Sequence, residues 1–206
     1  WDFRTNVLGN RTLAETDIAG FYCPSRRRTV QGGITLQVIF DGMTRGGTDY
    51  GACVGGGDCC FNLPGDTHPI TGPWWHQVGN EGMFLPNTAT AIASVRDGTS
   101  NTIMIGEVQR MYGSSARQQS LDGWAVGGAS NLFDGATGHN APGSGREDNG
   151  EGINASNFQA PGSDHPGGAQ FGMADGSVRF LSENTNQMLF ERLCTMREGV
   201  PVGDAF

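Results

Sequence analysis

The residues in this chain best able to do chemistry are its five cysteines and four histidines, because thiolates and imidazoles bind metals and act as nucleophiles or bases. A zinc site is possible in principle from Cys59, Cys60, His68 and His76. Their spacing matches no common zinc module, and adjacent cysteines rarely both bind one ion. We therefore do not expect a zinc ion at these four residues.

A second candidate metal site lies in an acidic segment. The oxygen ligands that calcium prefers could come from Glu147, Asp148, Asn149, Glu151 and Asn154. Their spacing does not fit the calcium loop of about 12 residues that EF-hands use, and an acidic loop is most often simply solvated. We expect no resident cofactor and keep calcium as an alternative.

Established catalytic and nucleic-acid-binding patterns are missing from the sequence. It contains no GxSxG, no HExxH, no phosphate-binding Walker loop and no strand-linked GxGxxG. All 13 basic residues are arginine, so a lysine nucleophile is excluded, and the formal net charge is -8. The one basic run, at 26–28, is too short for the basic stripe of a nucleic-acid binder. We expect a protein that is not an enzyme and does not bind nucleic acid.

The cysteines suggest one local crosslink. Cys53 is separated from Cys59 and Cys60 by a glycine-rich segment, GACVGGGDCC at 51–60, which is flexible enough to bring two thiols into disulfide geometry. The candidate disulfide joins Cys53 to Cys59 or Cys60, and buried free thiols are the alternative. Cys23 is expected to have no disulfide partner within this chain.

The pattern of the remaining chain favours strands over helices. Its 34 glycines and the prolines interrupt short apolar runs, as in a sheet with many turns. The candidate strands are 20–24, 34–40, 48–54, 82–86, 90–95, 101–108, 169–174 and 177–182. Residues 183–195 have the spacing of one helical face, with Asn184 or Asn186 as a cap. We expect a single α+β domain over 1–206, mostly antiparallel β, with long glycine-rich loops and a short C-terminal helix.

The last two strands flank Asp175-Gly176, a dipeptide that favours the tight turn of a two-residue hairpin. Asp175 is then a turn residue. His165 precedes the first strand of the hairpin, and about 3.3 Å of rise per residue places it roughly 17–20 Å from Asp175. We expect His165 to tie its loop to a neighbouring strand, and Glu107, at the end of 101–108, to accept hydrogen bonds from backbone or from His165.

Two further segments have alternative interpretations. Trp74 and Trp75 could form a flat platform for a sugar or a neighbouring subunit, but packing is the favoured interpretation. Residues 135–163 contain very few apolar side chains and are expected to form a long excursion.

Three motifs occur in the order of a known family. YCPSRR at 22–27, DGTSNTIMIGE at 97–107 and HPGGAQFGMADGSVRFLSE at 165–183 resemble the bacterial pseudopilin-like proteins with a prepilin-type processing-associated H-X9-DG domain. The family residues that carry over are His165, Asp175, Gly176 and Glu107, all as structural positions. The three cysteines at 53, 59 and 60 and the long 135–163 segment depart from the family pattern.

This resemblance implies a pilin-like globular head, displayed on a hydrophobic N-terminal helix that the present sequence lacks and that would be the only contact with the membrane. We expect a non-catalytic, exported subunit of a pilus-like or cell-surface filament, whose partners are copies of itself and whose location is extracellular or at the cell surface. The alternative is a monomeric extracytoplasmic module that binds a glycan or calcium.

Overall fold

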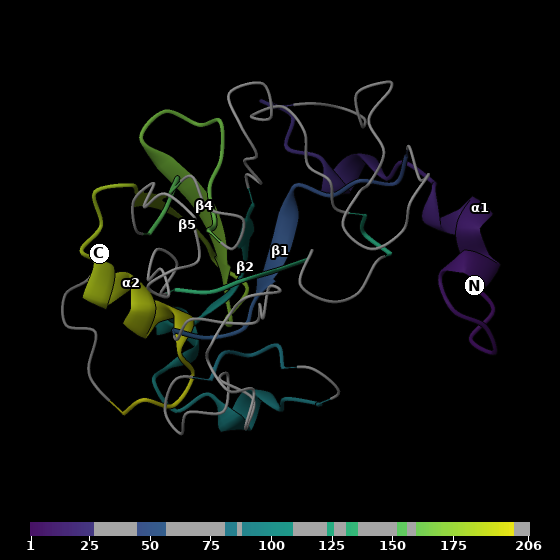
Figure 1. Ribbon diagram of the computed structural model, residues 1–206. Coiled ribbons are helices and arrows are strands. Elements are labelled where there is room, and N and C mark those ends of the chain that lie inside the picture. Colours follow the sequence, from purple (N-terminus) through teal and green to yellow (C-terminus); the bar gives the residue numbers. More distant parts are fainter. Residues whose placement is uncertain are drawn as a thin grey trace, which may run out of the picture.

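One mixed sheet organises the part of the chain that the structure describes (Figure 1). The structure is a computed structural model, and it describes residues 1–26, 45–56, 81–85, 88–108, 123–125, 131–135, 152–155 and 160–199. The strands are β1 (Tyr50–Cys53), β2 (Ile103–Glu107), β3 (Leu132–Phe133), β4 (Gly168–Met173) and β5 (Val178–Ser182). Their order across the sheet is β3-β1-β2-β4-β5. Only the β1–β3 pair is parallel among these strands, which confirms the expected α+β fold with mostly antiparallel pairing.

The helices are short. Within the described ranges, the α-helices are α1 (Arg11–Ala14) and α2 (Gln187–Cys194), and the 3-10 helices are η1 (Leu8–Asn10), η2 (Ala19–Phe21), η4 (Ile92–Ser94) and η5 (Thr99–Asn101). The side chain of Asn186 caps α2 by accepting a hydrogen bond from the backbone N–H of Leu189 at 3.1 Å, as one of the two predicted caps. Among the described residues, no helix has the length and apolar content needed to cross a membrane.

Two of the predicted strands are wrong, since residues 20–24 begin inside η2 and residues 90–95 contain η4. In η4 the backbone N–H of Val95 donates to the carbonyl of Ile92 at 3.0 Å, a local bond that replaces strand pairing. Apolar alternation indicates a strand only where a neighbouring strand supplies hydrogen bonds. No strand forms over 82–85, the described part of the predicted strand 82–86, although an isolated bridge joins Gly55 to the adjacent Glu81. The predicted strand at 34–40 lies outside the described residues.

The core lies between the inner face of the sheet and α2. Phe171 of β4 packs edge to face against Phe133 of β3 and Phe190 of α2, with ring centroids 6.1 and 5.6 Å apart. All three rings are at most 1% exposed. Gly106 in β2 makes room for them, because a Cβ there would lie 2.6 Å from the Phe171 ring. Ile153, from the segment expected to form a long excursion, is also buried in this core.

The predicted hairpin is present, but its turn has three residues and not two. Gly172 pairs with Val178, and the N–H of Met173 donates to the carbonyl of Ser177 at 2.8 Å. The turn therefore runs over 174–176, and Gly176 takes a left-handed φ of 85°. This is the pattern of a type I turn followed by a bulge residue that favours glycine.

The extra turn residue changes which side chains of β5 face the core. Phe171 is now opposite Arg179, and Ala169 is opposite Leu181, which is buried. Val178 and Phe180 lie on the outer face and are 69% and 46% exposed. A shift of one residue in register moves a strand's side chains to the opposite face.

We predict that Gly176→Ala lowers the free energy of unfolding by about 1–2 kcal/mol, because an L-residue is strained at this left-handed φ. No atom lies within 4 Å of the added Cβ, so the cost comes from the backbone alone. Gly20→Ala is the matched control, since Gly20 also has open space around it but no left-handed φ. Urea unfolding of the two variants measures the difference, and equal midpoints would contradict the turn geometry.

Candidate functional site

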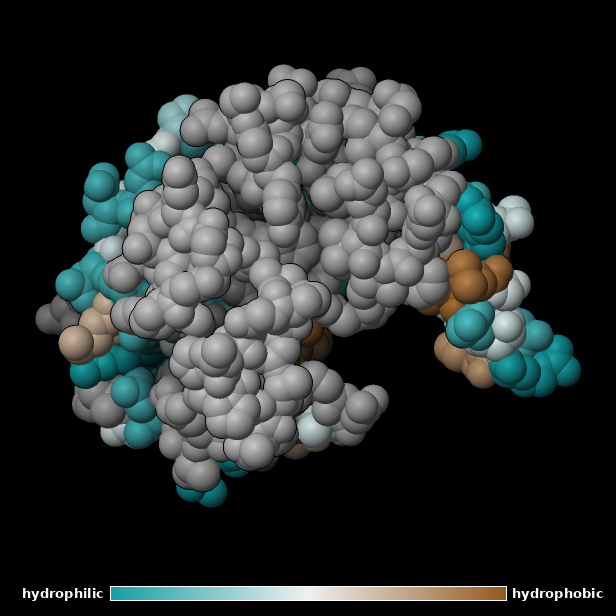
Figure 2. Space-filling view, in the orientation of Figure 1, coloured by the Kyte–Doolittle hydropathy of each residue, from teal (hydrophilic) through white to brown (hydrophobic). Residues whose placement is uncertain are grey.

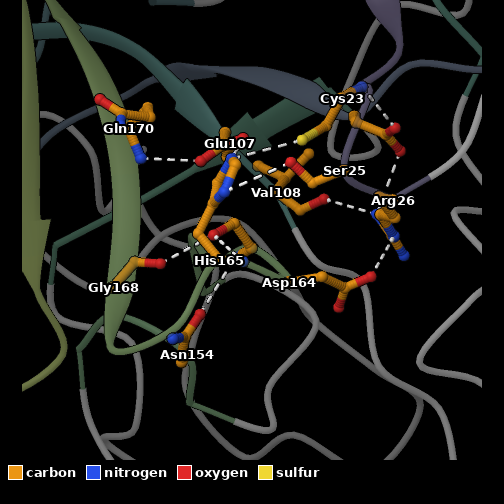
Figure 3. A network of polar contacts seen from close by, with 12 residues as sticks. Cys23, Ser25, Arg26, Glu107, Val108, Asn154, Asp164, His165, Gly168 and Gln170 are labelled. Atoms are coloured by element: carbon orange, nitrogen blue, oxygen red, sulfur yellow. Dashed lines mark hydrogen bonds and ion pairs between the residues drawn. The ribbon is translucent and has the colours of Figure 1, made fainter.

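Three polar side chains from segments far apart in sequence meet at one end of β2 (Figure 3). Cys23 follows η2, Glu107 ends β2, and His165 lies in the loop before β4. The His165 Nε2 atom is 3.2 Å from Oε1 of Glu107 and 3.5 Å from Sγ of Cys23. The predicted contact between Glu107 and His165 is thus present. We call these three residues the C-E-H cluster.

Each member of the C-E-H cluster comes from a different sequence motif. YCPSRR supplies Cys23, DGTSNTIMIGE supplies Glu107, and HPGGAQFGMADGSVRFLSE supplies His165. The ligand-type atoms of all three residues lie within 4.8 Å of one another, close enough for one metal ion to contact all of them. The motifs therefore converge in space although they are separated in sequence.

The sheet and the loop before β4 hold Glu107 and His165 in place. The second carboxylate oxygen of Glu107, Oε2, accepts a hydrogen bond from the backbone N–H of Gln170 at 2.7 Å. The N–H of His165 donates to Oγ of Ser163 at 3.0 Å, and that hydroxyl in turn donates to the carbonyl of Gly168 at 2.7 Å. These contacts fix the carboxylate so that Oε1 faces the imidazole.

A buried ion pair holds the Cys23 segment. The carboxylate of Asp49 accepts a hydrogen bond from the N–H of Cys23 at 2.9 Å and one from Nη1 of Arg26 at 3.0 Å. Nη1 also donates to the carbonyl of Val108 at 3.2 Å, just beyond β2. The side chains of Arg26 and Asp49 are each 2% exposed. The charge pair therefore fastens the Cys23 segment to the strand end that carries Glu107.

The imidazole of His165 is the exposed side of the cluster. Its side chain is 29% exposed, whereas that of Glu107 is 3% exposed and Cys23 as a whole is 3% exposed. The other ring nitrogen, Nδ1, lies 3.4 Å from Oγ of Ser25. Solvent therefore reaches the cluster past His165, while the thiol and the carboxylate face inward.

The surroundings favour a protonated thiol at neutral pH. Burial raises the pKa of the Cys23 thiol, and a hydrogen bond with Glu107 raises it further. Burial, together with the neighbouring Cys23, Glu107 and Asp49, raises the pKa of nearby Tyr50 to about 12. The carboxylates of Glu107 and Asp49 make the electrostatic potential around the thiol negative, which opposes the formation of a further anion.

This geometry does not fit a cysteine nucleophile. A catalytic relay places the nucleophile and the carboxylate on different ring nitrogens of the histidine, so that a proton passes through the ring. Here Cys23 and Glu107 both face Nε2. A thiol of raised pKa is also a poor source of the reactive thiolate. The cluster can tie the three segments together or bind a cation.

The other two motif residues lie at the opposite end of β4 and belong to the hairpin turn. Oδ1 of Asp175 accepts hydrogen bonds from the N–H and the hydroxyl of Ser177, at 2.8 and 2.6 Å. These bonds lower the pKa of the Asp175 carboxyl. Gly176 supplies the left-handed residue of the turn. His165 and Asp175 therefore do not share a site, as the strand length between them predicted.

The structure gives no support to the predicted disulfide at Cys53. Cys53 is a free and fully buried thiol at the end of β1, and it donates a hydrogen bond to the carbonyl of Cys194 at 3.5 Å. Its side chain therefore packs in the core against α2. Burial also raises the pKa of the Cys194 thiol. Cys59 and Cys60 lie outside the described residues.

Most of the other sequence candidates also lie outside the described residues: His68, His76, His139, Trp74, Trp75, Glu147, Asp148, Asn149 and Glu151. Asn154, from the candidate calcium set, is described. Its Oδ1 accepts a hydrogen bond from the N–H of Ser163, and its Nδ2 donates to Glu183, both at 2.9 Å. Asn154 therefore supports the loop that carries His165, and these hydrogen bonds occupy its amide.

Sequence reasoning missed the partners of Cys23. The sequence did not predict a place in any site for Ser25, Arg26 or Asp49. For Cys23 itself, the only expectation was that it has no disulfide partner in this chain. The available signal was that Cys23, Ser25 and Arg26 all belong to YCPSRR. No sequence motif pointed to Asp49, because its partners Cys23 and Arg26 are distant in sequence and approach it only in the folded chain.

We predict that Asp49→Ala lowers the free energy of unfolding by about 3–5 kcal/mol, because the buried Arg26 guanidinium loses its closest carboxylate. Asp2→Ala removes the partner of Arg4 in an exposed ion pair and is the control; the unfolding midpoint should not change measurably. Urea denaturation followed by circular dichroism tests both variants. Equal stability losses would show that burial of the Arg26–Asp49 pair contributes nothing.

We also predict a distinctive pH profile for alkylation of Cys23. In metal-free buffer, labelling of the folded domain should accelerate at a higher pH than labelling of the unfolded chain, because the folded thiol has a raised pKa. Glu107→Gln should move the profile back toward the ordinary thiol range, since it removes a negative charge. Mass spectrometry of the Cys23 peptide gives the shape of each profile. Coinciding profiles for folded and unfolded wild-type protein would contradict the prediction.

Comparison with known proteins identifies a family. Residues 3–188 match the model of a family described as "Protein of unknown function (DUF1559)". No curated protein and no solved structure matched the chain. The match covers all three motifs and every residue of the C-E-H cluster.

Proposed function

This chain belongs to the DUF1559 family, and from that premise we propose that it is a non-catalytic, exported subunit of a pilus-like or cell-surface assembly. In this proposal the domain is a pilin-like head that follows a hydrophobic N-terminal helix. Its partners are copies of itself, and its location is extracellular or at the cell surface. The resemblance of the three motifs to pseudopilin-like proteins supports this proposal.

The observation that carries the proposal is a pair of exposed apolar surfaces. The first, here called the N-terminal surface, consists of Trp1, Phe3, Leu8, Leu13, Ile18 and Phe21, which are between 37% and 91% exposed. Figure 2 shows hydrophobic residues exposed at this end of the molecule, beside polar ones. Contiguous apolar patches on a soluble domain often mark a surface that contacts another molecule.

The second surface is the outer face of the sheet, formed by Ile105 of β2 with Val178 and Phe180 of β5, which are 40–69% exposed. The glycines of β4 let these side chains spread over the sheet: Ile105 lies over Gly172, and Phe180 lies over Gly168. We call this the outer sheet surface.

Two different patches on one subunit suit a head-to-tail contact, in which one patch of each copy meets the other patch of the next. In Figure 1, α1 of the N-terminal segment and the β4–β5 hairpin lie on opposite sides of β1. Contacts of this type generate rings or open filaments. The positions of the N-terminal and outer sheet surfaces are therefore compatible with the assembly proposed here.

The C-E-H cluster adds to the case against catalysis. Its thiol has a raised pKa, and its carboxylate is buried and hydrogen-bonded on Oε2. Cys23 and Glu107 also share one ring nitrogen of His165, which leaves no relay for proton transfer. These features favour a role for the three motifs in building the head.

The test of this function is electron microscopy of a full-length precursor expressed together with prepilin-processing machinery. Filaments, tubes or rings that contain this domain are the expected result. A dispersed monomer that binds one glycan or calcium tightly would contradict assembly and favour the alternative binding module.

We predict that Val178→Lys reduces assembly by at least about tenfold, because it places a charge in an apolar contact, where a charge is costly to desolvate. Met188→Lys is the matched control: Met188 is 58% exposed on α2 and belongs to neither surface. Both variants should keep the wild-type melting temperature. Sedimentation and electron microscopy measure the assembled fraction, and wild-type assembly by the Val178 variant would remove the outer sheet surface from the proposal.

A further inference from the structure

We propose that the C-E-H cluster is a mononuclear zinc site, with Sγ of Cys23, Oε1 of Glu107 and Nε2 of His165 as protein ligands and water as the fourth ligand. The resemblance stated for the sequence assigns no metal to these residues, and the assembly function does not require one. This inference therefore stands independently of the proposed function. This site differs from the zinc site that the sequence made improbable, whose ligands would have been the residues at 59, 60, 68 and 76.

The distances between the ligand atoms fit tetrahedral zinc. With Zn–N and Zn–O bonds near 2.0–2.1 Å and a Zn–S bond near 2.3 Å, a tetrahedron has N···O and N···S edges of about 3.3 and 3.6 Å. The measured separations are 3.2 Å from His165 Nε2 to Glu107 Oε1 and 3.5 Å from His165 Nε2 to Cys23 Sγ. Both measured separations therefore match edges of a tetrahedral zinc site, and the three ligand atoms all lie within 4.8 Å of one another.

The ligand chemistry also selects zinc among common divalent ions. Calcium and magnesium prefer all-oxygen ligands, whereas a thiolate and an imidazole suit a softer ion such as Zn²⁺. The charges balance in the bound state, because the thiolate of Cys23 and the carboxylate of Glu107 together offset the two positive charges of zinc. Binding releases the thiol proton of Cys23 to solvent, and the Zn–S bond takes its place.

The surroundings meet the requirement for supporting contacts around a metal site. Metal-bound histidines use their second ring nitrogen to contact a polar group, and ligating carboxylates are themselves hydrogen-bonded. Nδ1 of His165 lies 3.4 Å from Oγ of Ser25, and Oε2 of Glu107 accepts the Gln170 N–H at 2.7 Å. The side chains of His165 and Glu107 are thus each oriented toward the centre of the cluster by a contact on the far side.

Burial and charge agree with this assignment. The carboxylates of Glu107 and Asp49 lie within and beside the cluster and make a local field that attracts a cation. Cys23 and Glu107 are nearly inaccessible, but the 29% exposure of the His165 side chain leaves a route for the ion and room for water. The C-E-H cluster is the group of metal-binding type found among the described residues.

The alternative is a cluster held by hydrogen bonds alone. In that case the Cys23 thiol stays protonated, as its raised pKa favours in the absence of a metal, and added zinc finds no high-affinity site. The two arrangements use the same residues and differ in their response to metal. Metal binding and metal-dependent stability therefore distinguish them.

The first experiment treats the purified chain with a chelator, removes the chelator and titrates with ZnCl₂ alone. We expect one zinc ion per chain by elemental analysis and calorimetry, and a higher melting temperature on binding, because a ligand that binds only the folded state stabilises it. Co²⁺ serves as a spectroscopic probe, and thiolate-to-cobalt charge-transfer absorption should appear. The affinity should fall on acidification, because protons compete with the metal ion for its ligand atoms.

The variants identify the ligands. Cys23→Ser and His165→Gln should each weaken zinc binding by more than about 100-fold, beyond the 10–100-fold typical of outer contacts. Ser25→Ala, which removes a supporting contact, should weaken binding by about 10–100-fold without changing the stoichiometry. Cys53→Ala is the control that removes a buried thiol outside the cluster, and it should bind zinc like the wild type.

Folding is checked separately, so that a collapsed variant cannot imitate a lost ligand. Each variant is melted in the presence of chelator, and only variants that unfold cooperatively are scored; for a variant that does not fold, Cys23→Ala or His165→Asn takes its place. Absence of stoichiometric zinc binding by the wild type would overturn the proposal. Undiminished binding by Cys23→Ser, with no charge-transfer band for Co²⁺, would also overturn it. Failure of the zinc test leaves the electron-microscopy test of assembly unaffected.

Discussion

The burial of one carboxylate, that of Glu107, constrains much of the arrangement around the sheet. A buried charge is costly unless polar partners surround it, and Glu107 is 2% exposed. Its partners come from Gln170 in β4 and from His165 in the preceding loop. Neither is near Glu107 in sequence, so burial of this end of β2 depends on contacts with the C-terminal part of the chain.

The ion pair between Arg26 and Asp49 extends this dependence to the N-terminal part. Asp49 accepts the N–H of Cys23, and Arg26 donates to the carbonyl of Val108, the residue after Glu107. The loops around the C-E-H cluster are therefore linked by polar bonds to one strand end, while the aromatic core lies between the sheet and α2. Polar contacts fix the position of the cluster, and apolar packing supplies the main driving force for folding.

Local sequence signals predicted the elements better than the site. Asp175 and Gly176 marked the hairpin, Asn186 marked the start of α2, and the strand ending at Glu107 was recognised, because each signal concerns neighbours in the chain. The contact of Glu107 with His165 was predicted from the place of Glu107 at a strand end, as one of two alternatives beside hydrogen bonds from backbone. The sequence did not show that Cys23 and Asp49 lie beside this contact, since their positions depend on contacts between segments far apart in the chain. The strand predicted at 90–95 failed for the same reason: the sequence does not show whether a partner strand is available.

The length of the 174–176 turn has a consequence for the surface as well as for the fold. With a two-residue turn at 175–176 in this same sequence, Val178 and Phe180 would stand opposite Met173 and Phe171 and turn toward the core. The additional residue, accommodated by the left-handed Gly176, turns them outward instead. The apolar character of the outer sheet surface therefore depends on the number of residues in the turn.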